Sequence, residues 1–325
     1  MHAFLLCAGF GTRMRPVTAE TPKSLVTVAG RPLLDHLLDE LTAWSALTEI
    51  HVAVNHEDAP AFREWAAGHR ADLETQGIGL HLHDDGVEAP DDQLGCVGDL
   101  RFLLDAVGLP ADGALVSGGD SLYRFPLAPL LNAYDGTTNR VLALHEPDPE
   151  RRAQSSVLQL DGPTVTAVHD DPTGTASTRI CPSWLLLSAE GLGAIVPYLD
   201  DGGPPDTLGA FLDRLARTHS VQAHRLPQTG HLRLHCNTPD DLEHARKLAG
   251  PSPCRGPLRS SLRACSRSSG VLQRRRRWAV SGSRWACPEC VRAGRPRNAP
   301  SVSARPPSSA WGPTAPSPSA PRASL

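Results

Sequence analysis

Residues 5–23 read LLCAGFGTRMRPVTAETPK, and the rest of the chain is best interpreted outward from this stretch. The apolar run at residues 3–8 predicts a short buried strand, and Gly9 and Gly11 predict a tight turn directly after it. Because glycine has no Cβ, such a turn can bring backbone N–H groups close to phosphate oxygens. Arg13 and Lys23 would add positive charge there, since guanidinium and ammonium groups both bind phosphate.

Two glycines alone do not identify the nucleotide. No Gly-Lys-Ser/Thr sequence closes the turn, so it is not a P-loop. The dinucleotide-binding fingerprint requires a third glycine three positions after Gly11, where this chain has Met14. A dehydrogenase of the Rossmann type is therefore not expected.

The complete pattern is much more specific and resembles the signature of the sugar-1-phosphate nucleotidyltransferases, or nucleotide-sugar pyrophosphorylases. That signature, G-x-G-T-R-x-x-P-x-T-x-x-x-P-K, is matched by Gly9, Gly11, Thr12, Arg13, Pro16, Thr18, Pro22 and Lys23. The resemblance covers about residues 1–249. It implies an α/β chain with a three-layer, Rossmann-like nucleotide-diphospho-sugar transferase fold, whose central sheet is mixed and mostly parallel.

The resemblance also implies a reaction, in which an NTP and a sugar 1-phosphate give an NDP-sugar and pyrophosphate. In that reaction Gly9, Gly11 and Thr12 would bind the nucleotide. Arg13 would stabilise the leaving pyrophosphate, and Lys23 would neutralise charge at the α-phosphate. No covalent nucleophile is needed, so the protein's task is to position the substrates and to neutralise their charge.

A second stretch, residues 83–105, resembles the loop that reads the base in this family. It contains Asp85-Gly86 and then Leu94-Gly95-Cys96-Val97-Gly98 before an expected helix. The resemblance implies that Asp85, Gly86 and Gly95 bind nucleotide. Whether Asp85, Glu88 or Gln93 faces the base stays open. From these residues alone a solvated acidic loop before a helix would be the better explanation, but the distance of the stretch from the Lys23 motif favours the base-reading loop.

Two further positions point to a metal. Asp120 follows the apolar run at residues 114–117, and a carboxylate beyond the end of a buried strand suits Mg²⁺. It matches the family's metal-binding aspartate. The second metal ligand of the family is also an aspartate, in W-x-D-x-G/N-T-P, but here His235 stands in its place and Arg233 replaces the tryptophan. We expect Mg²⁺ at Asp120 and His235, with Mn²⁺ as the alternative because imidazole suits it better.

Another departure is Asp171, which stands where the family has a lysine that contacts the sugar phosphate. Together with His235, it leaves open an alternative function, a nucleotide-sugar-binding homologue with little or no catalysis and a regulatory role. A different alternative concerns His81 and His83, which point the same way from a predicted strand. They could form a metal pair or simply occupy a half-buried strand face, and no third ligand is evident nearby.

Composition divides the chain at about residue 250. Residues 250–325 are rich in Pro, Ser and Arg, with fourteen arginines, no lysine and a single acid, although the whole chain has a net charge of −3. We expect residues 1–249 to form the nucleotidyltransferase domain and 250–325 a basic tail that is disordered or arises from a reading-frame artefact. The tail's one C-x-x-C pair is not enough for a zinc site.

The remaining expectations concern partners and compartment. No run of 18 apolar residues and no basic signal-peptide start is present, so we expect a cytoplasmic protein without a membrane partner. The scattered cysteines before residue 250 are expected to be reduced core thiols. The expected partners are an NTP and a sugar 1-phosphate. We do not expect nucleic acid, and a homo-oligomer stays open.

Overall fold

A computed structural model describes residues 1–170, 175–226 and 233–249, all of which belong to one compact unit, Met1–Arg259. Asp171 and the predicted tail lie outside the described residues, and the predicted domain division after residue 249 stays a prediction. None of the described helices is long and apolar enough to cross a membrane.

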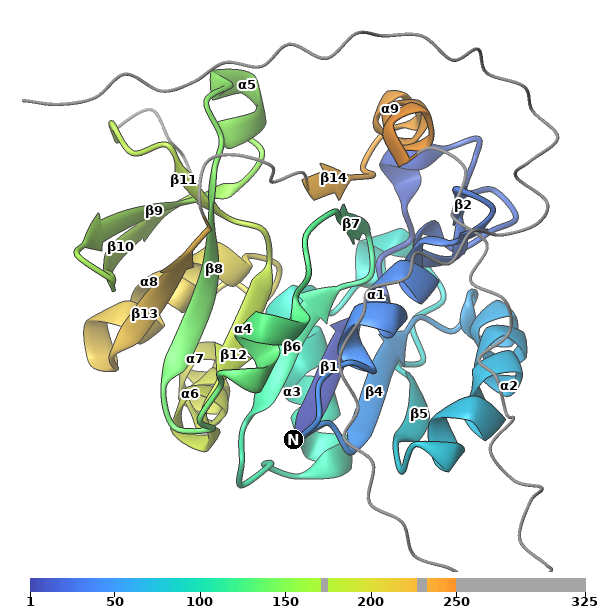
Figure 1. The fold of residues 1–325 in the computed structure, drawn as a ribbon, viewed down its shortest axis with the longest axis horizontal. Coiled ribbons are helices and arrows are strands. Elements are labelled where there is room, and N and C mark those ends of the chain that lie inside the picture. Colours follow the sequence, from blue (N-terminus) through green and yellow to red (C-terminus); the bar gives the residue numbers. More distant parts are fainter. Residues whose placement is uncertain (171–174, 227–232, 250–325) are drawn as a thin grey trace, which may run out of the picture. The chain divides into compact units, whose positions relative to one another are not determined.

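The centre of the fold is a mixed sheet with ten strands among the described residues (Figure 1). Four neighbouring strands, β6, β1, β4 and β5, pair only in parallel with one another, and β13 also runs parallel to β8. The other pairings are antiparallel. The predicted α/β fold with a mixed sheet is confirmed, although parallel pairs predominate only in the half built from the first part of the chain. The strands, in sheet order, are β11 (Arg179–Cys181), β9 (Ser156–Asp161), β10 (Thr164–His169), β13 (Val221–Arg225), β8 (Asn139–His145), β12 (Trp184–Leu187), β6 (Ala114–Gly118), β1 (His2–Leu6), β4 (Glu49–Val54) and β5 (Gly79–Asp84).

Helices cover both faces of this sheet and complete the three layers. On one face lie α1 (Leu33–Leu41), α2 (Ala59–Thr75) and α4 (Ala128–Asn132), whose apolar residues share a single core cluster with the sheet. On the other face lie α3 (Cys96–Val107), α6 (Ala189–Gly193), α7 (Ile195–Asp200) and α8 (Leu208–Thr218), which share a second cluster. The short α5 (Pro149–Arg152) follows β8.

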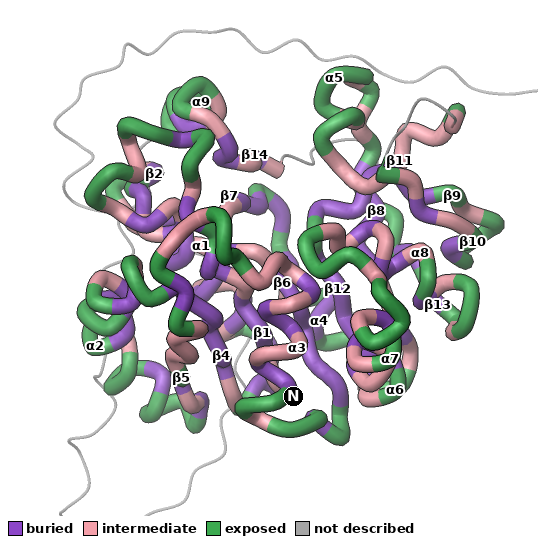
Figure 2. The backbone as a smooth tube through the Cα atoms, turned by 180° about the vertical axis from the view of Figure 1, so that it is seen from behind, coloured by how far each residue is buried: buried purple, intermediate pink, exposed green. Residues whose placement is uncertain are grey.

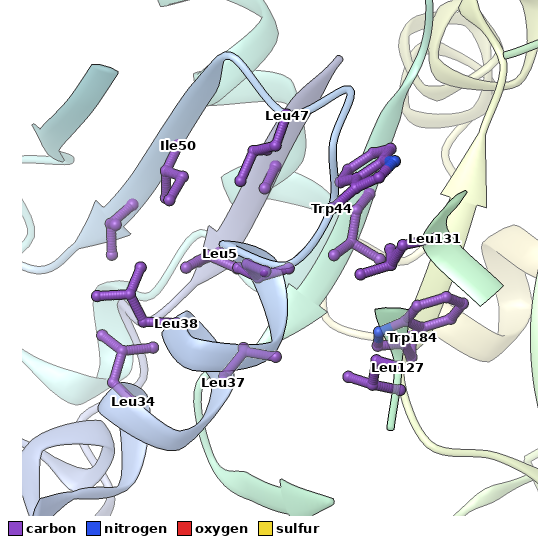
Figure 3. Packing of buried hydrophobic residues seen from close by; sticks show 14 of the residues in the cluster. Leu5, Leu34, Leu37, Leu38, Trp44, Leu47, Ile50, Leu127, Leu131 and Trp184 are labelled. Atoms are coloured by element: carbon purple, nitrogen blue, oxygen red, sulfur yellow. The ribbon is translucent and has the colours of Figure 1, made fainter. Parts of the chain in front are cut away.

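Strand β1 shows how the sequence alternation builds these layers. Ala3 and Leu5 belong to the first cluster and Phe4 to the second, because successive side chains of a strand point to opposite faces. Figure 2 shows that the central strands are buried along most of their length. In the first cluster Leu5 packs among α1 and the loop after it, and Trp44 and Trp184 are both at most 2% exposed (Figure 3). A strand covered on both faces has to be apolar at nearly every position, as residues 3–6 are.

Two predicted elements are interrupted in the structure. The sequence of residues 180–187 predicts a single strand, but the structure divides it into β11 and β12, because Pro182 has no N–H to donate and Ser183 adopts a φ of 55°. The sequence of residues 189–199 predicts a single helix, which the structure divides into α6 and α7. Pro197 cannot bond to the carbonyl of Gly193, four residues earlier, so the two short helices meet at Ala194.

Two other expectations need correction or completion. Asp206 was expected to cap the helix at residues 207–217, but α8 begins after Thr207, and Asp206 instead accepts a hydrogen bond from the Thr207 hydroxyl at 3.2 Å. Strand β13, which lies between β10 and β8, was not predicted. The predicted reduced core cysteines are confirmed as free thiols, three buried and Cys96 half-buried.

A third, smaller cluster attaches the last described segment to the first loop of the chain. Two short sheets frame it, β2 (Thr27–Val28) with β3 (Arg31–Pro32), and β7 (Ser121–Tyr123) with β14 (Arg233–His235). Helix α9 (Pro239–Ala249) packs here through Leu242 and Ala245 against Met14, which is fully buried. This packing brings residues 233–239 next to residues 12–28, although most of the chain separates them.

Candidate functional site

The candidate site lies at the edge where the parallel strands end. Strand β1 leads to Gly9, β5 to Asp85 and β6 to Asp120. Since neighbouring parallel strands have their carboxyl ends at one edge, the three predicted motifs converge there, as ligand sites do in open α/β sheets. The sheet topology accounts for this convergence.

The glycine turn has the backbone freedom that its sequence implies. Gly11 has a φ of 61°, and a Cβ at this position would lie 3.2 Å from side-chain atoms of both Thr18 and Lys23. The Thr18 hydroxyl donates to the carbonyl of Gly11 at 2.9 Å and holds the loop folded back. Gly9 meets open space instead, and Thr12 and Arg13 are exposed. The turn therefore presents its Gly9 end and the Arg13 guanidinium to solvent, where a polyphosphate could bind them.

Lys23 and Asp120 form the central contact of the site. The Lys23 ammonium lies 2.7 Å from Oδ2 of Asp120, and both side chains are partly exposed. Lys23 is the first residue of the short 3₁₀ helix Lys23–Leu25. The restricted backbone of the preceding Pro22 helps to position it. The two predicted residues are thus brought together, and a polyphosphate entering the site would meet both.

His235 approaches the same carboxylate from the other end of the chain. Antiparallel pairing of β14 with β7 places His235 opposite Ser121, and His235 Nε2 lies 3.0 Å from Oδ2 of Asp120. Asn237 connects the group. Its Oδ1 accepts a hydrogen bond from Lys23, and its Nδ2 lies 3.1 Å from Nδ1 of His235.

This network defines the hydrogen-bonding role of each nitrogen. An ammonium can only donate, so Asn237 must offer its oxygen to Lys23 and its NH₂ to His235. Nδ1 of His235 therefore accepts, and a neutral His235 carries its proton on Nε2 and donates it to Asp120. In this arrangement the lone pair of the His235 ring is on Nδ1 and accepts from Asn237, so none points toward Asp120.

The charges in the site act strongly on each other. Burial alone would raise the pKa of Asp120, but His235 and Lys23 beside it hold that pKa well below its ordinary value. Burial lowers the pKa of His235, and the nearby Arg233 lowers it further, while Asp120 acts in the opposite direction. Asp120 therefore stays ionised, and the site keeps a fixed negative group among several cationic ones.

The predicted base-reading loop follows β5. Asp85 accepts the backbone N–H of Val87 at 2.8 Å, and Gly86 has a φ of 77° with open space around it. Gly95 also has a positive φ, 79°, but a Cβ there would lie 2.6 Å from backbone atoms of Pro205 and Asp206. The close approach that requires Gly95 is thus made by the chain's own backbone.

Sequence reasoning missed two residues of this region. Asn237 is 7% exposed and joins Lys23 to His235, and its position in the Asn-Thr-Pro sequence was the available signal. Asp99, on α3, is also 7% exposed, and burial together with Asp85 raises its pKa to about 7. Nothing in the local sequence distinguishes Asp99 from an ordinary residue of a helical first turn.

The described residues contain no group of three or more His, Cys, Asp or Glu side chains suited to hold a metal ion. His81 and His83, the alternative metal pair, belong to no such group; His81 is exposed and His83 half-buried on β5. At Asp120, Oδ2 is already engaged by Lys23 and His235, whereas Oδ1 is contacted only by the Ser121 hydroxyl at 3.3 Å among the described residues. One carboxylate oxygen is therefore accessible, which fits Mg²⁺ when substrate phosphates supply the other ligands.

Known proteins resemble this chain in sequence. A family model described as nucleotidyl transferase matches residues 2–155. N-acetylmuramate alpha-1-phosphate uridylyltransferase from Caulobacter vibrioides is 40% identical over 89 residues, which are 27% of this chain and 34% of that protein. Mannose-1-phosphate guanyltransferase from Aspergillus oryzae is 45% identical over 56 residues, 17% of this chain and 15% of that protein. The chain thus matches about a third or less of the length of these relatives.

Solved structures share the fold over a longer range. A Bacillus anthracis protein assigned as a glucose-1-phosphate thymidylyltransferase has a TM-score of 0.63 at 16% identity, covering 79% of this chain and 98% of that one. CTP:phosphocholine cytidylyltransferase from Streptococcus pneumoniae has a TM-score of 0.57 at 18% identity, covering 76% and 98%. These likenesses confirm the expected fold. Residues 2–155 of the chain match the nucleotidyl transferase family.

Proposed function

We propose that the protein transfers a nucleotidyl group from an NTP to a sugar 1-phosphate. A phosphate oxygen of the sugar 1-phosphate attacks the α-phosphorus and forms a new P–O bond. The bond from the α-phosphorus to the β-phosphate bridging oxygen breaks, and pyrophosphate leaves with that electron pair. The observation that carries the proposal is the contact between Lys23 and Asp120 beside the glycine turn.

Each residue has a role that follows from its charge and place. Gly9, Gly11 and Thr12 would hold the phosphates through the backbone of the turn, and the exposed Arg13 would bind the departing pyrophosphate. Lys23 would move from Asp120 toward the α-phosphate, where negative charge gathers in the transition state.

A bound Mg²⁺ would be held by Oδ1 of Asp120 and by substrate phosphates, and would neutralise phosphate charge. His235 donates to Asp120 in the present arrangement, so it would become a ligand only after giving up that hydrogen bond. Mn²⁺ would favour this exchange more than Mg²⁺, because it accepts imidazole more readily. In either case the protein's own residues position the phosphates and keep Asp120 ionised.

The relatives suggest which substrates to test. We would measure pyrophosphate release by the full chain with UTP, GTP, CTP, ATP and dTTP. Each would be combined with N-acetylmuramate 1-phosphate, mannose 1-phosphate and glucose 1-phosphate, first with Mg²⁺ and then with Mn²⁺. Pyrophosphate release with one pair would establish the reaction and identify its substrates. Absence of release with every pair would overturn the proposal.

The chain offers a well-matched control for Lys23. It has only two lysines, and the other, Lys247, is exposed on α9 and pairs with Glu243. Lys23→Ala should reduce turnover by about 100-fold or more, as loss of a group that stabilises transition-state charge does. Lys247→Ala should leave turnover unchanged. Equal turnover of both variants and the parent would refute the role of Lys23.

A second function, nucleotide-sugar binding with little catalysis, is favoured by the hydrogen bond between His235 and Asp120, which occupies the carboxylate. His235→Asp distinguishes the two. If the enzyme is merely impaired, the variant should turn over faster with Mg²⁺ than the parent. If turnover falls, His235 itself contributes to catalysis at this site.

A further inference from the structure

A cavity of about 140 Å³ adjoins the candidate site. It lies between the segment formed by the end of β8, α5 and β11 on one side and β14 with α9 on the other, and Figure 1 shows β14 between α5 and α9. Its walls include Arg151, Arg233, His145, His244 and His235. His235 also touches Asp120, so the cavity and the Lys23 network share one wall.

Arg233 is the cation of this cavity that is nearest to the Lys23 network. Its Nε donates to the hydroxyl of Ser121 at 3.1 Å, and Ser121 directly follows Asp120 in the chain. This hydrogen bond uses only one of the five guanidinium N–H groups. Within residues 1–170, 175–226 and 233–249, no carboxylate forms an ion pair with Arg233, and its two terminal nitrogens make no hydrogen bond.

The acidic groups of the cavity wall have partners other than Arg233. Oδ2 of Asp241 accepts the backbone N–H groups of Asn237 and Thr238 and the Thr238 hydroxyl, between 2.9 and 3.2 Å. Glu146 accepts the backbone N–H of Asp148 at 3.0 Å. The terminal nitrogens of Arg233 thus have no acceptor among the described residues and could bind an anion that enters the cavity.

We propose that Arg233 binds the phosphate of the acceptor sugar 1-phosphate through its terminal nitrogens. This assignment rests on the proposed function. Arg233 makes or breaks no covalent bond; it holds the attacking phosphate near Asp120 and Lys23, while the glycine turn holds the NTP. A guanidinium suits this task because its planar fork matches two phosphate oxygens.

The two departures noted at Asp171 and Arg233 then compensate each other. Compared with the family pattern, this chain has an acid at position 171 in place of a phosphate-binding lysine. At position 233 it has a cation in place of a neutral tryptophan. The acceptor phosphate would thus keep one cationic partner, supplied from a different position of the chain. Position 171 lies outside the described residues, so the argument depends on Arg233 and its cavity alone.

The test compares Arg233→Met and Arg233→Lys with Arg214→Met in the full chain. Arg214 pairs with Asp201 on the exposed surface of α8, so its loss removes the same charge far from the cavity. For each protein we would measure KM for the NTP and for the sugar 1-phosphate. By titration calorimetry we would also measure affinity for glucose 1-phosphate, mannose 1-phosphate and inorganic phosphate, with circular dichroism confirming that each variant is folded.

Arg233→Met should raise KM for the sugar 1-phosphate by about 10- to 100-fold, as expected when a charge-assisted hydrogen-bonded pair is lost. Its affinity for inorganic phosphate should fall by a similar factor. KM for the NTP should change less than about twofold, Arg233→Lys should recover part of the loss, and Arg214→Met should match the parent. A rise confined to KM for the NTP overturns the assignment, as does unchanged affinity of Arg233→Met for all three probes, or a parent that binds none. Absence of pyrophosphate release by a parent that still binds these probes through Arg233 would overturn the proposed reaction instead.

Discussion

Four histidines on three neighbouring strands should make the protein sensitive to acid. His2, His51 and His83 form a chain in which successive ring nitrogens lie 3.1 Å apart, and His81 stacks on His51 with ring centroids at 5.0 Å. His81 also contacts Glu49 at 2.7 Å. His51, at the centre, is only 5% exposed. A charge on this ring would be poorly solvated and close to three other imidazoles.

The size of the effect follows from His51. Burial, together with His81, His83 and His2, lowers its pKa from 6.5 to about 3. Between these two values the unfolded chain binds a proton that the folded protein does not, so stability falls as the pH decreases below about 6.5. For pKa values of 6.5 and about 3, the free energy of unfolding should decrease by about 2 kcal/mol between pH 7 and pH 5. Burial also lowers the pKa of His2 and His83, and both therefore act in the same direction.

The assay is urea unfolding followed by tryptophan fluorescence at pH 5, 6, 7 and 8, comparing the parent with His51→Gln. The parent should lose about 2 kcal/mol more than the variant on going from pH 7 to pH 5, because glutamine does not titrate. His244→Gln serves as the control, since His244 is exposed on α9. If the parent and His51→Gln show the same pH dependence, the buried imidazole is not the cause and the reasoning fails.

Four substitutions test other parts of the structure by unfolding and activity measurements. Gly95→Ala should lower the free energy of unfolding by about 3 kcal/mol because the new Cβ meets backbone at 2.6 Å, whereas Gly68→Ala, in open space within α2, should raise it by about 0.5–1 kcal/mol. Asp35→Ala leaves the buried Trp65 indole N–H without its 2.8 Å acceptor and should cost about 1–3 kcal/mol; a loss below 0.5 kcal/mol would contradict the value assigned to that bond. Asn237→Ala removes the group that holds Lys23 and His235 together, and turnover should fall by about 10-fold with little change in melting temperature.

Much of the fold could be predicted because its signals are local. The apolar run of β1 and the helical spacing of Leu34, Leu37, Leu38 and Leu41 in α1 each lie within a few residues. The elements that were missed depend on distant partners. Strand β13 pairs with β8 and β10. The division at Pro182 lets β11 pair with β9 and β12 with β6, while both also pair with β8, which no local pattern reveals.

The candidate site shows the same limit with chemical consequences. The neighbourhood of Lys23 and Asp120 could be predicted, because both follow strands that end at one edge of the sheet. The orientation of His235 could not, because it depends on Asn237, which accepts from Lys23 and thereby directs the imidazole proton toward Asp120. From sequence alone, a histidine in place of an aspartate suggests a change of metal. In the structure the same residue is first of all a hydrogen-bond donor that helps keep Asp120 ionised, so its effect on turnover depends on whether a substrate phosphate can draw Lys23 away from this shared carboxylate.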